Sequence, residues 1–273
     1  LLVRSATQAK RDLIDACPAL KLIGRGGVGM DNIDVVYAQE KGIKVINTPN
    51  ASSHSVAELT FAHLFSGVRF LYDANRNMPL EGDTRFNELK KDYANGHELK
   101  GKTLGIIGLG RIGRAVATIA LGLGMKVIAY DPEQQEATIT LSFFDGRSLD
   151  FVIKTISKKE VLEEADFITL HIPAQKEAVI GEKEFQQMKD GVGIINVARG
   201  GVIDEEALLH ALEHEKVAFA GLDVFEGEPT PSIRILMHPQ VSLSPHIGAA
   251  TLEAQERVGD ELAEQIIEMM SEK

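Results

Sequence analysis

The sequence predicts an α/β fold made of two doubly wound parallel-sheet domains. Short apolar, strand-like runs alternate with helical patterns over residues 1–48 and again over residues 103–248, and this order of elements is typical of parallel sheets with helices on their faces. A glycine-rich turn, Gly108-Leu-Gly-Arg-Ile-Gly113, stands between one strand-like run and one helical pattern. Asp131 ends the next apolar run. A chain of 273 residues is long enough for two such domains.

The first 48 residues predict a small sheet with short helices. We expect strands over 1–5, 20–24 and 43–47, helices over 9–17 and 34–41, and an end to this part at Pro49. The chain begins Leu1-Leu-Val inside a strand-like run, without Met. We therefore expect this domain to be N-terminally incomplete.

A long helical pattern follows over 55–75, opened by a serine cap, and residues 78–98 are polar and irregular with one short helical segment. We then expect strands over 103–107 and 125–130, separated by a helix that places Ile112, Val116, Ile119 and Leu123 on one face. The run Phe143-Phe144-Asp145-Gly146 predicts a turn between two strands. Later strands are expected over 166–172, 193–198, 218–225 and 240–244, with a helix over 204–215 capped by Asp204 and a final amphipathic helix from 251 to the end.

The glycine-rich turn has the spacing of a dinucleotide-binding site. Gly108 permits the tight turn, Gly110 lets the backbone approach a pyrophosphate, and Gly113 lets the helix pack closely on the strand. Backbone N–H groups at the start of the helix, at Arg111 and Ile112, are expected to face the phosphates. Because a strand, a helix, a second strand and an acid occur in order around it, the motif indicates a bound dinucleotide.

The acid at the end of the second strand identifies the dinucleotide. Asp131 follows the first glycine by roughly 20 residues, the distance expected for a ribose-binding carboxylate. Such a carboxylate accepts hydrogen bonds from the ribose hydroxyls and repels a 2′-phosphate. The sequence therefore predicts NAD as the cofactor, in preference to NADP.

Composition excludes several other partners. The net charge of −11 argues against nucleic acid and anionic membrane surfaces as partners, and no stretch is apolar over 18 residues or more. The single cysteine permits no intrachain disulfide, and no signal peptide is visible, so we expect a cytoplasmic location. The histidines lack the spacing of metal ligands, so we expect no metal.

Three polar residues follow predicted strands in the second half, at the edge where parallel sheets bind ligands. Arg199 can hold a carboxylate through two hydrogen bonds, and His246 can take or give a proton near neutral pH. Glu228 can bond the far ring nitrogen of that histidine, fix its tautomer and favour its protonated form. Together they suit hydride transfer on a hydroxy acid, and we interpret them as the catalytic residues.

These motifs resemble the D-isomer-specific 2-hydroxyacid dehydrogenases over nearly the whole chain. The resemblance rests on the glycine-rich turn and on the segments that run from Asn196 to Asp204, from Gly221 to Pro229 and from Ser244 to Thr251. It implies a Rossmann NAD-binding domain over 49–248, a smaller flavodoxin-like lid domain over 1–48 that binds substrate, and a C-terminal helix over 249–273 that returns to the lid.

The resemblance also implies a role for individual positions. Arg199 matches the arginine that binds the substrate carboxylate, Glu228 the acidic partner and His246 the proton donor and acceptor. Asp223 matches a contact to the nicotinamide carboxamide. Further cofactor contacts are expected at His171, Ile172 and Pro173 beside the adenine, and at Val197, Ala198 and Gly248.

Within the family, the chain is most similar to the 3-phosphoglycerate dehydrogenases. The segments that carry this similarity run from Leu2 to Thr7, from Gly24 to Asp34 and from Asn47 to Asn50. The similarity implies that Arg4 helps to hold a substrate phosphate and that backbone amides of the loop at Gly26 bind the carboxylate; consecutive glycine N–H groups also form an anion-binding concavity on general grounds. The residues expected to bind substrate are Arg4, Ser5, Gly27, Val28, Gly29 and Asn50. A homodimer built on residues 55–100 is also implied.

The function expected is therefore the NAD-dependent oxidation of D-3-phosphoglycerate to 3-phosphohydroxypyruvate, a step of serine biosynthesis. Two alternatives remain open. The first keeps the fold and changes the substrate, as in a hydroxypyruvate or glyoxylate reductase or a D-lactate dehydrogenase. The second is an NAD-sensing interaction protein, like the corepressors built on this scaffold.

Overall fold

The computed structural model describes residues 1–271 and divides into two compact units. Unit 1 contains Leu1–Ser55 together with the C-terminal segment from Ala249, and unit 2 contains Val56–Gly248. Residues 49–55, which were expected in the cofactor domain, group with unit 1 by their contacts. Each unit is built on a parallel sheet, so the predicted α/β class is confirmed.

Unit 1 is a three-stranded parallel sheet in the order β1-β2-β3. Its strands are β1 (Leu2–Val3), β2 (Leu22–Arg25) and β3 (Lys44–Asn47), and its helices are α1 (Arg11–Asp15), α2 (Val35–Glu40) and α11 (Leu252–Ser271). Asp34 caps α2 by accepting a hydrogen bond from the Tyr37 N–H at 3.1 Å. The small core is made of Val3, Ala9, Ile14, Ile23, Ile33, Ala38 and Ile43.

Unit 2 contains a six-stranded sheet in the order β11-β10-β9-β8-β4-β5, with every pair parallel. The strands are β4 (Thr103–Ile107), β5 (Lys126–Tyr130), β8 (Phe167–Leu170), β9 (Val192–Asn196), β10 (Val217–Leu222) and β11 (Val241–Leu243). The chain runs from β4 outward to β5 and then crosses to β8 on the other side of β4. The strand order therefore reverses between β4 and β8, and ligands bind at such a point beyond the carboxyl ends of the strands.

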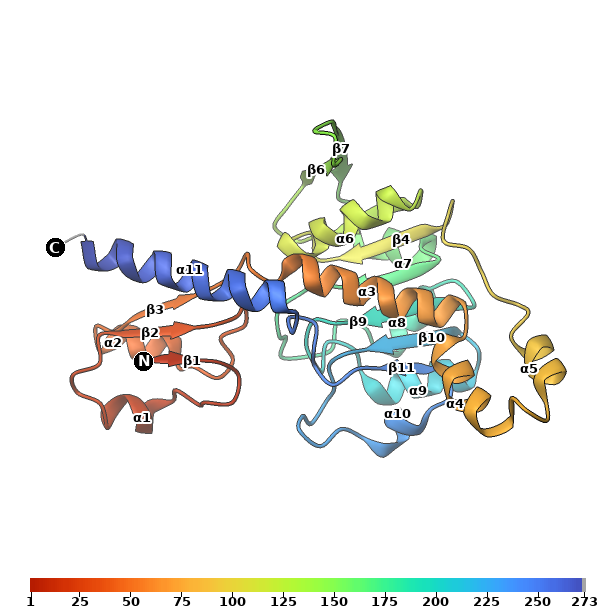
Figure 1. Cartoon of the computed structure of the whole chain (residues 1–273), viewed down its shortest axis with the longest axis horizontal. Helices are drawn as coiled ribbons and strands as arrows, with labels where there is room; N and C mark the ends of the chain where they lie inside the picture. Colours follow the sequence, from red (N-terminus) through yellow and green to blue (C-terminus); the bar gives the residue numbers. More distant parts are fainter. Residues whose placement is uncertain (272–273) are drawn as a thin grey trace. The chain divides into compact units, whose positions relative to one another are not determined.

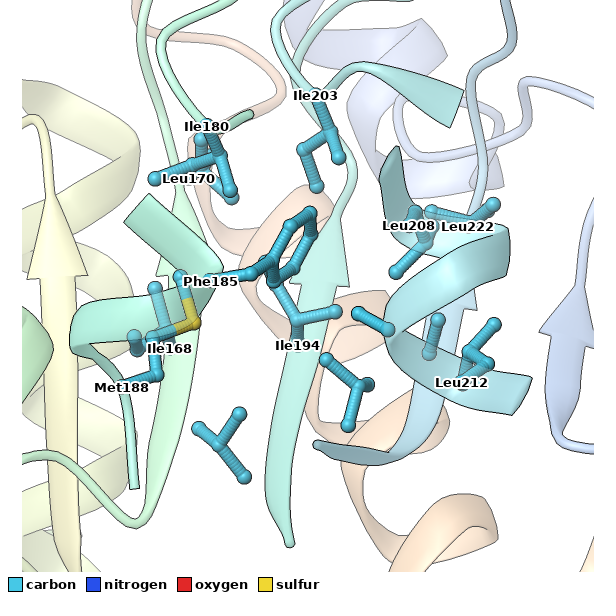
Figure 2. Packing of buried hydrophobic residues seen from close by; sticks show 14 of the residues in the cluster. Ile168, Leu170, Ile180, Phe185, Met188, Ile194, Ile203, Leu208, Leu212 and Leu222 are labelled. Carbon is cyan, nitrogen blue, oxygen red and sulfur yellow. The ribbon is translucent and has the colours of Figure 1, made fainter. Parts of the chain in front are cut away.

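Helices cover both faces of this sheet (Figure 1). One face packs against α7 (Lys158–Glu164), α8 (Glu182–Gln187), α9 (Glu205–Glu213) and α10 (Ile233–Met237), and the other against α3 (Ser53–Val68) and α6 (Arg111–Gly122). Because strand side chains alternate between faces, Ile194 enters the first apolar cluster while Ile195 enters the second. Figure 2 shows Ile194 beside Phe185 of α8 and near Leu208 and Leu212 of α9.

Two segments differ from or extend the sequence expectation. The helix expected over 55–75 is broken, because Phe70 adopts a left-handed conformation with φ 57° between α3 and α4 (Leu71–Glu81); α5 (Phe86–Asp92) follows. The turn expected at Phe143 is confirmed: it joins β6 (Glu136–Ser142) and β7 (Ser148–Lys154) into an antiparallel hairpin that projects from the sheet of unit 2 (Figure 1). Within the described residues, no helix combines the length and the apolar character that crossing a membrane requires.

Candidate functional site

The glycine-rich turn joins β4 to α6 at the switch point of the sheet. Gly108 has φ +99°, and a Cβ there would lie 2.5 Å from the His171 carbonyl oxygen. A Cβ on Gly113 would lie 2.1 Å from the Gly108 carbonyl oxygen, so this glycine permits the close contact between helix and turn. A Cβ on Gly110 would meet no atom within 4 Å. The three glycines thus form a tight turn with open space at its middle position.

The first turn of α6 presents N–H groups at this open space. Gly110 is the N-cap of the helix, and no side chain caps it. N–H groups in the first turn of a helix have no partner within the helix, and the helix dipole favours an anion there. Arg111, Ile112 and Gly113 begin α6, so the turn can hold the pyrophosphate of a dinucleotide.

Asp131 lies at the end of β5, beside the same turn. Its carboxylate accepts the Leu109 N–H at 2.7 Å, the Glu133 N–H at 2.9 Å and the Gln134 N–H at 3.1 Å. These bonds fix the carboxylate next to the glycine turn, the position from which it can bind the ribose hydroxyls of NAD.

His171 lies at the end of β8, in contact with the glycine turn through its backbone. Its Nε2 pairs with the Thr169 hydroxyl at 2.9 Å, while its buried Nδ1 has no partner in the described chain. Burial lowers the pKa of His171 to about 3, so the ring is neutral near pH 7. A neutral, enclosed ring suits a wall beside the cofactor, with Ile172 half-buried and Pro173 exposed after it.

Glu228 and His246 form a hydrogen-bonded pair in unit 2. The Nδ1 atom of His246 lies 2.8 Å from Glu228 Oε2, and Glu228 Oε1 accepts the Phe225 N–H at 2.9 Å. Because the carboxylate can only accept, Nδ1 carries the proton in this pair, and Nε2 is left as the ring nitrogen that can take or give one. About half of the His246 side chain is exposed. The pair lines a cavity of about 410 Å³ whose other walls are Phe225, Pro229, Pro231, Leu236, Leu243, Ser244 and Pro245.

The loop that carries His246 is attached to Asp223 at the end of β10. The buried Asp223 carboxylate accepts the Ile247 N–H and the Gly248 N–H, each at 2.8 Å, and its backbone oxygen accepts the His246 N–H at 2.8 Å. His246 adopts a left-handed conformation, with φ 55°. Asp223 therefore holds this loop in place, and its carboxylate keeps acceptor capacity for a further donor such as an amide.

Arg199 follows β9 and is half-buried. The buried Asn196 shapes the turn before it, because its amide donates to the Arg199 carbonyl at 2.9 Å while its side-chain oxygen accepts the Ala198 N–H at 3.1 Å. Arg199 Nη1 also donates to the Ala198 carbonyl at 2.6 Å. Sequence reasoning missed Asn196, although its place two residues before Ala198 at the end of a strand was a usable signal. Val197 and Ala198 are buried.

In unit 1 the loop that is expected to bind an anion through its backbone follows β2. The Gly26 N–H donates to the Val3 carbonyl and the Gly27 N–H to the Arg25 carbonyl. Among the described residues, no acceptor takes the Val28 or Gly29 N–H. Two of the expected donors are therefore available to an anion, and Gly27 contributes shape, with φ +147°.

Two arginines lie beside this loop. Arg4 is exposed, and a Cβ on Gly26 would lie 3.7 Å from its Cγ. Arg25, which sequence reasoning missed, places Nη1 2.0 Å from where a Cβ on Gly27 would lie, so its guanidinium lies directly against this glycine. Ser5 is exposed, and Asn50 donates to Glu261 Oε1 at 3.2 Å. No cluster of three potential metal ligands occurs in the described part of the chain.

The glycine turn, the open space at Gly110 and the placement of Asp131 fit NAD, and a histidine–carboxylate pair belongs to the same unit. This combination of fold and site defines the class of NAD-dependent dehydrogenases.

Comparison with known proteins identifies the family. Residues 61–248 match the NAD-binding domain of the D-isomer-specific 2-hydroxyacid dehydrogenases. A hydroxypyruvate reductase of Thermotoga maritima is 48% identical over 97% of this chain and 83% of its own length, and a D-3-phosphoglycerate dehydrogenase of Bacillus subtilis is 43% identical over 98% of this chain and 49% of its own length. The crystal structure of a D-lactate dehydrogenase of Aquifex aeolicus, complexed with NAD and lactic acid, has a TM-score of 0.78 and 33% identity over 99% of this chain and 82% of that one.

The chain belongs to the D-isomer-specific 2-hydroxyacid dehydrogenase family, whose members are oxidoreductases. It spans about half the length of the phosphoglycerate dehydrogenases that it matches.

Proposed function

We propose that the chain catalyses the NAD-dependent interconversion of D-3-phosphoglycerate and 3-phosphohydroxypyruvate. The observation that carries the substrate assignment is the pair of cations at the glycine loop of unit 1. The Arg4 guanidinium is exposed and has no carboxylate partner within the described residues, and the Arg25 guanidinium lies against Gly27 of the same loop. Two cations beside two available N–H groups suit a substrate that carries a phosphate as well as a carboxylate.

The residues of unit 2 supply the acid–base chemistry. When bound, NAD accepts the hydride that leaves C2 of the hydroxy acid. His246 Nε2 takes the proton of the C2 hydroxyl, and the Glu228 carboxylate at Nδ1 stabilises the resulting imidazolium. Arg199 binds the substrate carboxylate and so orients C2. In the reverse direction the same imidazolium returns the proton to the developing alkoxide.

A substrate panel tests this function. The chain is assayed by NADH absorbance with phosphohydroxypyruvate, hydroxypyruvate, glyoxylate and pyruvate, and with NADPH in place of NADH. We expect the highest kcat/KM with phosphohydroxypyruvate and NADH. If none of the 2-oxo acids is reduced, the result favours the NAD-sensing interaction protein and contradicts the proposed activity.

Arg4→Ala tests the phosphate assignment. Loss of a charge-assisted hydrogen bond costs about 1.5–3 kcal/mol, so we expect the KM for phosphohydroxypyruvate to rise roughly 10- to 100-fold while the KM for hydroxypyruvate changes little. Arg11→Ala is the matched control, because Arg11 is an exposed arginine of the same unit whose guanidinium pairs with Asp34 at 3.2 Å. Equal effects of Arg4→Ala on both substrates would remove Arg4 from phosphate binding.

Hydroxypyruvate reduction is the second candidate. The relative that is 48% identical to this chain is named a hydroxypyruvate reductase, and the match covers 83% of that relative's length. This similarity favours the second candidate. In that case hydroxypyruvate gives the higher kcat/KM in the panel and Arg4→Ala has no substrate-dependent effect.

We also propose a homodimer through residues 55–100. This segment exposes several large apolar side chains: Phe65, Leu71, Met78, Leu80 and Phe86. Exposed apolar groups gathered on consecutive helices suit burial against a second copy. Sedimentation should give twice the chain mass, and Leu80→Lys with Phe86→Lys should shift it toward the monomer; a monomeric parent chain would contradict the proposal.

A further inference from the structure

A buried histidine lies behind the loop that carries His246. His63 belongs to α3 and is 4% exposed. Its Nδ1 lies 2.9 Å from the Ser242 hydroxyl and its Nε2 2.8 Å from the Ser244 hydroxyl. Ser242 belongs to β11, and Ser244 follows β11 in the segment that leads into the His246 loop. A buried polar ring needs hydrogen-bond partners, and this one has two.

The direction of the hydrogen bonds follows from Asp223. The Ser244 hydroxyl donates to Asp223 Oδ1 at 2.6 Å, because a carboxylate only accepts. The Ser244 oxygen therefore accepts its second bond from His63 Nε2–H. A neutral imidazole has one N–H, so Nδ1 accepts the Ser242 hydroxyl proton. Burial lowers the pKa of His63 below its ordinary value, which keeps the ring neutral and this pattern in place.

The sheet is shaped to admit the ring. A Cβ on Gly221 of β10 would lie 2.6 Å from the Cβ and 3.0 Å from the Cγ of His63. The glycine therefore leaves the space in which the imidazole reaches both serines. Because a Cβ alone makes this close contact, even alanine at position 221 would push against the imidazole.

We propose that His63 is a positioning residue for His246, acting through Ser244 and Asp223. By donating to Ser244, His63 orients the hydroxyl toward Asp223 Oδ1. The oriented Asp223 carboxylate accepts the N–H groups of Ile247 and Gly248, the two residues after His246, and the Asp223 carbonyl accepts the His246 N–H. His246 has a left-handed backbone, which a non-glycine residue keeps only when its surroundings impose it. The effect of His63 on catalysis rests on the proposed function. Its effect on the conformation of the His246 loop does not depend on that function.

Four variants of the full chain separate this role from simple stability. His63→Leu removes both hydrogen bonds of the ring, and His63→Gln returns an N–H donor toward Ser244. Ser244→Ala cuts the connection to Asp223. Ser242→Ala is the matched control, because it removes the other hydrogen bond of the same buried ring and leaves the connection to Asp223 intact.

Turnover is the first readout. We expect His63→Leu and Ser244→Ala each to lower kcat about tenfold, with the KM for NADH changed less than twofold, because a misplaced acid–base group slows the reaction without weakening cofactor binding. The double variant His63→Leu/Ser244→Ala should be no slower than Ser244→Ala alone. His63→Gln should recover most of the activity, and Ser242→Ala should keep kcat within twofold. Equal losses in Ser242→Ala and His63→Leu, or additive losses in the double variant, would overturn the proposal.

Backbone amide resonances are the second readout and need no activity. In ¹⁵N spectra, His63→Leu should shift the Ile247 and Gly248 signals and speed their hydrogen exchange, whereas Ser242→Ala should leave both unchanged. If the parent chain reduces no 2-oxo acid, the proposed function fails, and these signals still decide whether His63 holds the loop. Unchanged signals in His63→Leu would overturn the proposal whatever the turnover.

Discussion

His246 owes its position and its protonation pattern to its neighbours. Glu228 fixes the proton on Nδ1, Asp223 accepts the N–H groups of His246, Ile247 and Gly248, and the His246 backbone is left-handed, with φ 55°. Nε2 is then the ring nitrogen left to exchange a proton, and in the proposed reaction the pair acts as one acid–base unit. Loss of either member should affect turnover and spare the glycine turn that holds the cofactor.

The substitution His246→Ala tests the proposed acid–base role of His246. General acid–base catalysis contributes roughly 10²–10⁴-fold, so we expect kcat to fall by that range while NADH binding, followed by its fluorescence, stays within about twofold. Glu228→Gln should also lower kcat, because an amide stabilises the imidazolium less than a carboxylate does. Glu226→Gln is the control, since the Glu226 carboxylate accepts the Glu205 N–H instead of pairing with His246. Unchanged turnover in His246→Ala would remove His246 from the mechanism.

At the scale of elements, the segment made of β4, the glycine turn and α6 contains one glycine that is needed for packing and another that leaves space for a ligand. A side chain at position 113 would collide with the Gly108 carbonyl group, whereas a side chain at position 110 would point into open space. We therefore expect the two glycines of this motif to be required for different reasons, Gly113 for packing the helix on the turn and Gly110 for admitting the cofactor.

Gly113→Ala and Gly110→Ala form a matched pair that tests this division. A Cβ at 113 would lie 2.1 Å from a carbonyl oxygen that cannot move freely, so we expect the free energy of unfolding to fall by about 1–3 kcal/mol. At 110 the free energy of unfolding should change by less than about 1 kcal/mol, while the Kd for NADH should rise, since the methyl group occupies the space of the pyrophosphate. Urea unfolding and NADH titration check both. Comparable losses of stability in the two variants would contradict the division.

The segment that runs from β4 to Asp131 was predicted correctly from the sequence. Its strand, turn, helix and acid follow one another within residues 103–131, so local patterns were sufficient to predict it. The Asp204 cap of α9 is equally local and is confirmed by its bond to the Ala207 N–H at 3.0 Å. The break at Phe70 and the short helices α7, α8 and α10 were not predicted, because a helical pattern of apolar residues that is short or interrupted cannot be distinguished from a loop. His63 was missed because its partner Ser244 lies 181 positions further along the chain.

At the scale of the whole molecule, buried neutral histidines make stability depend on pH. His171 and His63 both have pKa values lowered by burial, and that of His171 falls to about 3. Between pH 6.5 and about 3 the unfolded chain therefore binds a proton at residue 171 that the folded chain does not, so stability rises with pH in this range. The contribution is complete above pH 6.5 and is lost progressively as the pH falls toward 3. Carboxylates with lowered pKa values, such as Asp166 beside Lys189, lose their contribution at lower pH.

Urea unfolding at pH 8 and pH 5 tests this dependence, with tyrosine fluorescence as the probe because the chain has no tryptophan. The protonation of an unfolded histidine at pH 5, where the folded ring stays neutral, should cost about 2 kcal/mol of stability for His171 alone. His171→Gln should reduce the difference between the two pH values by about that amount, whereas His97→Gln, at an exposed histidine, should leave it in place. A pH difference that persists in full in His171→Gln would show that the buried ring does not couple to folding. Because His171 also lies beside the glycine turn, saturating NADH should raise the midpoint at both pH values without removing the slope due to this residue.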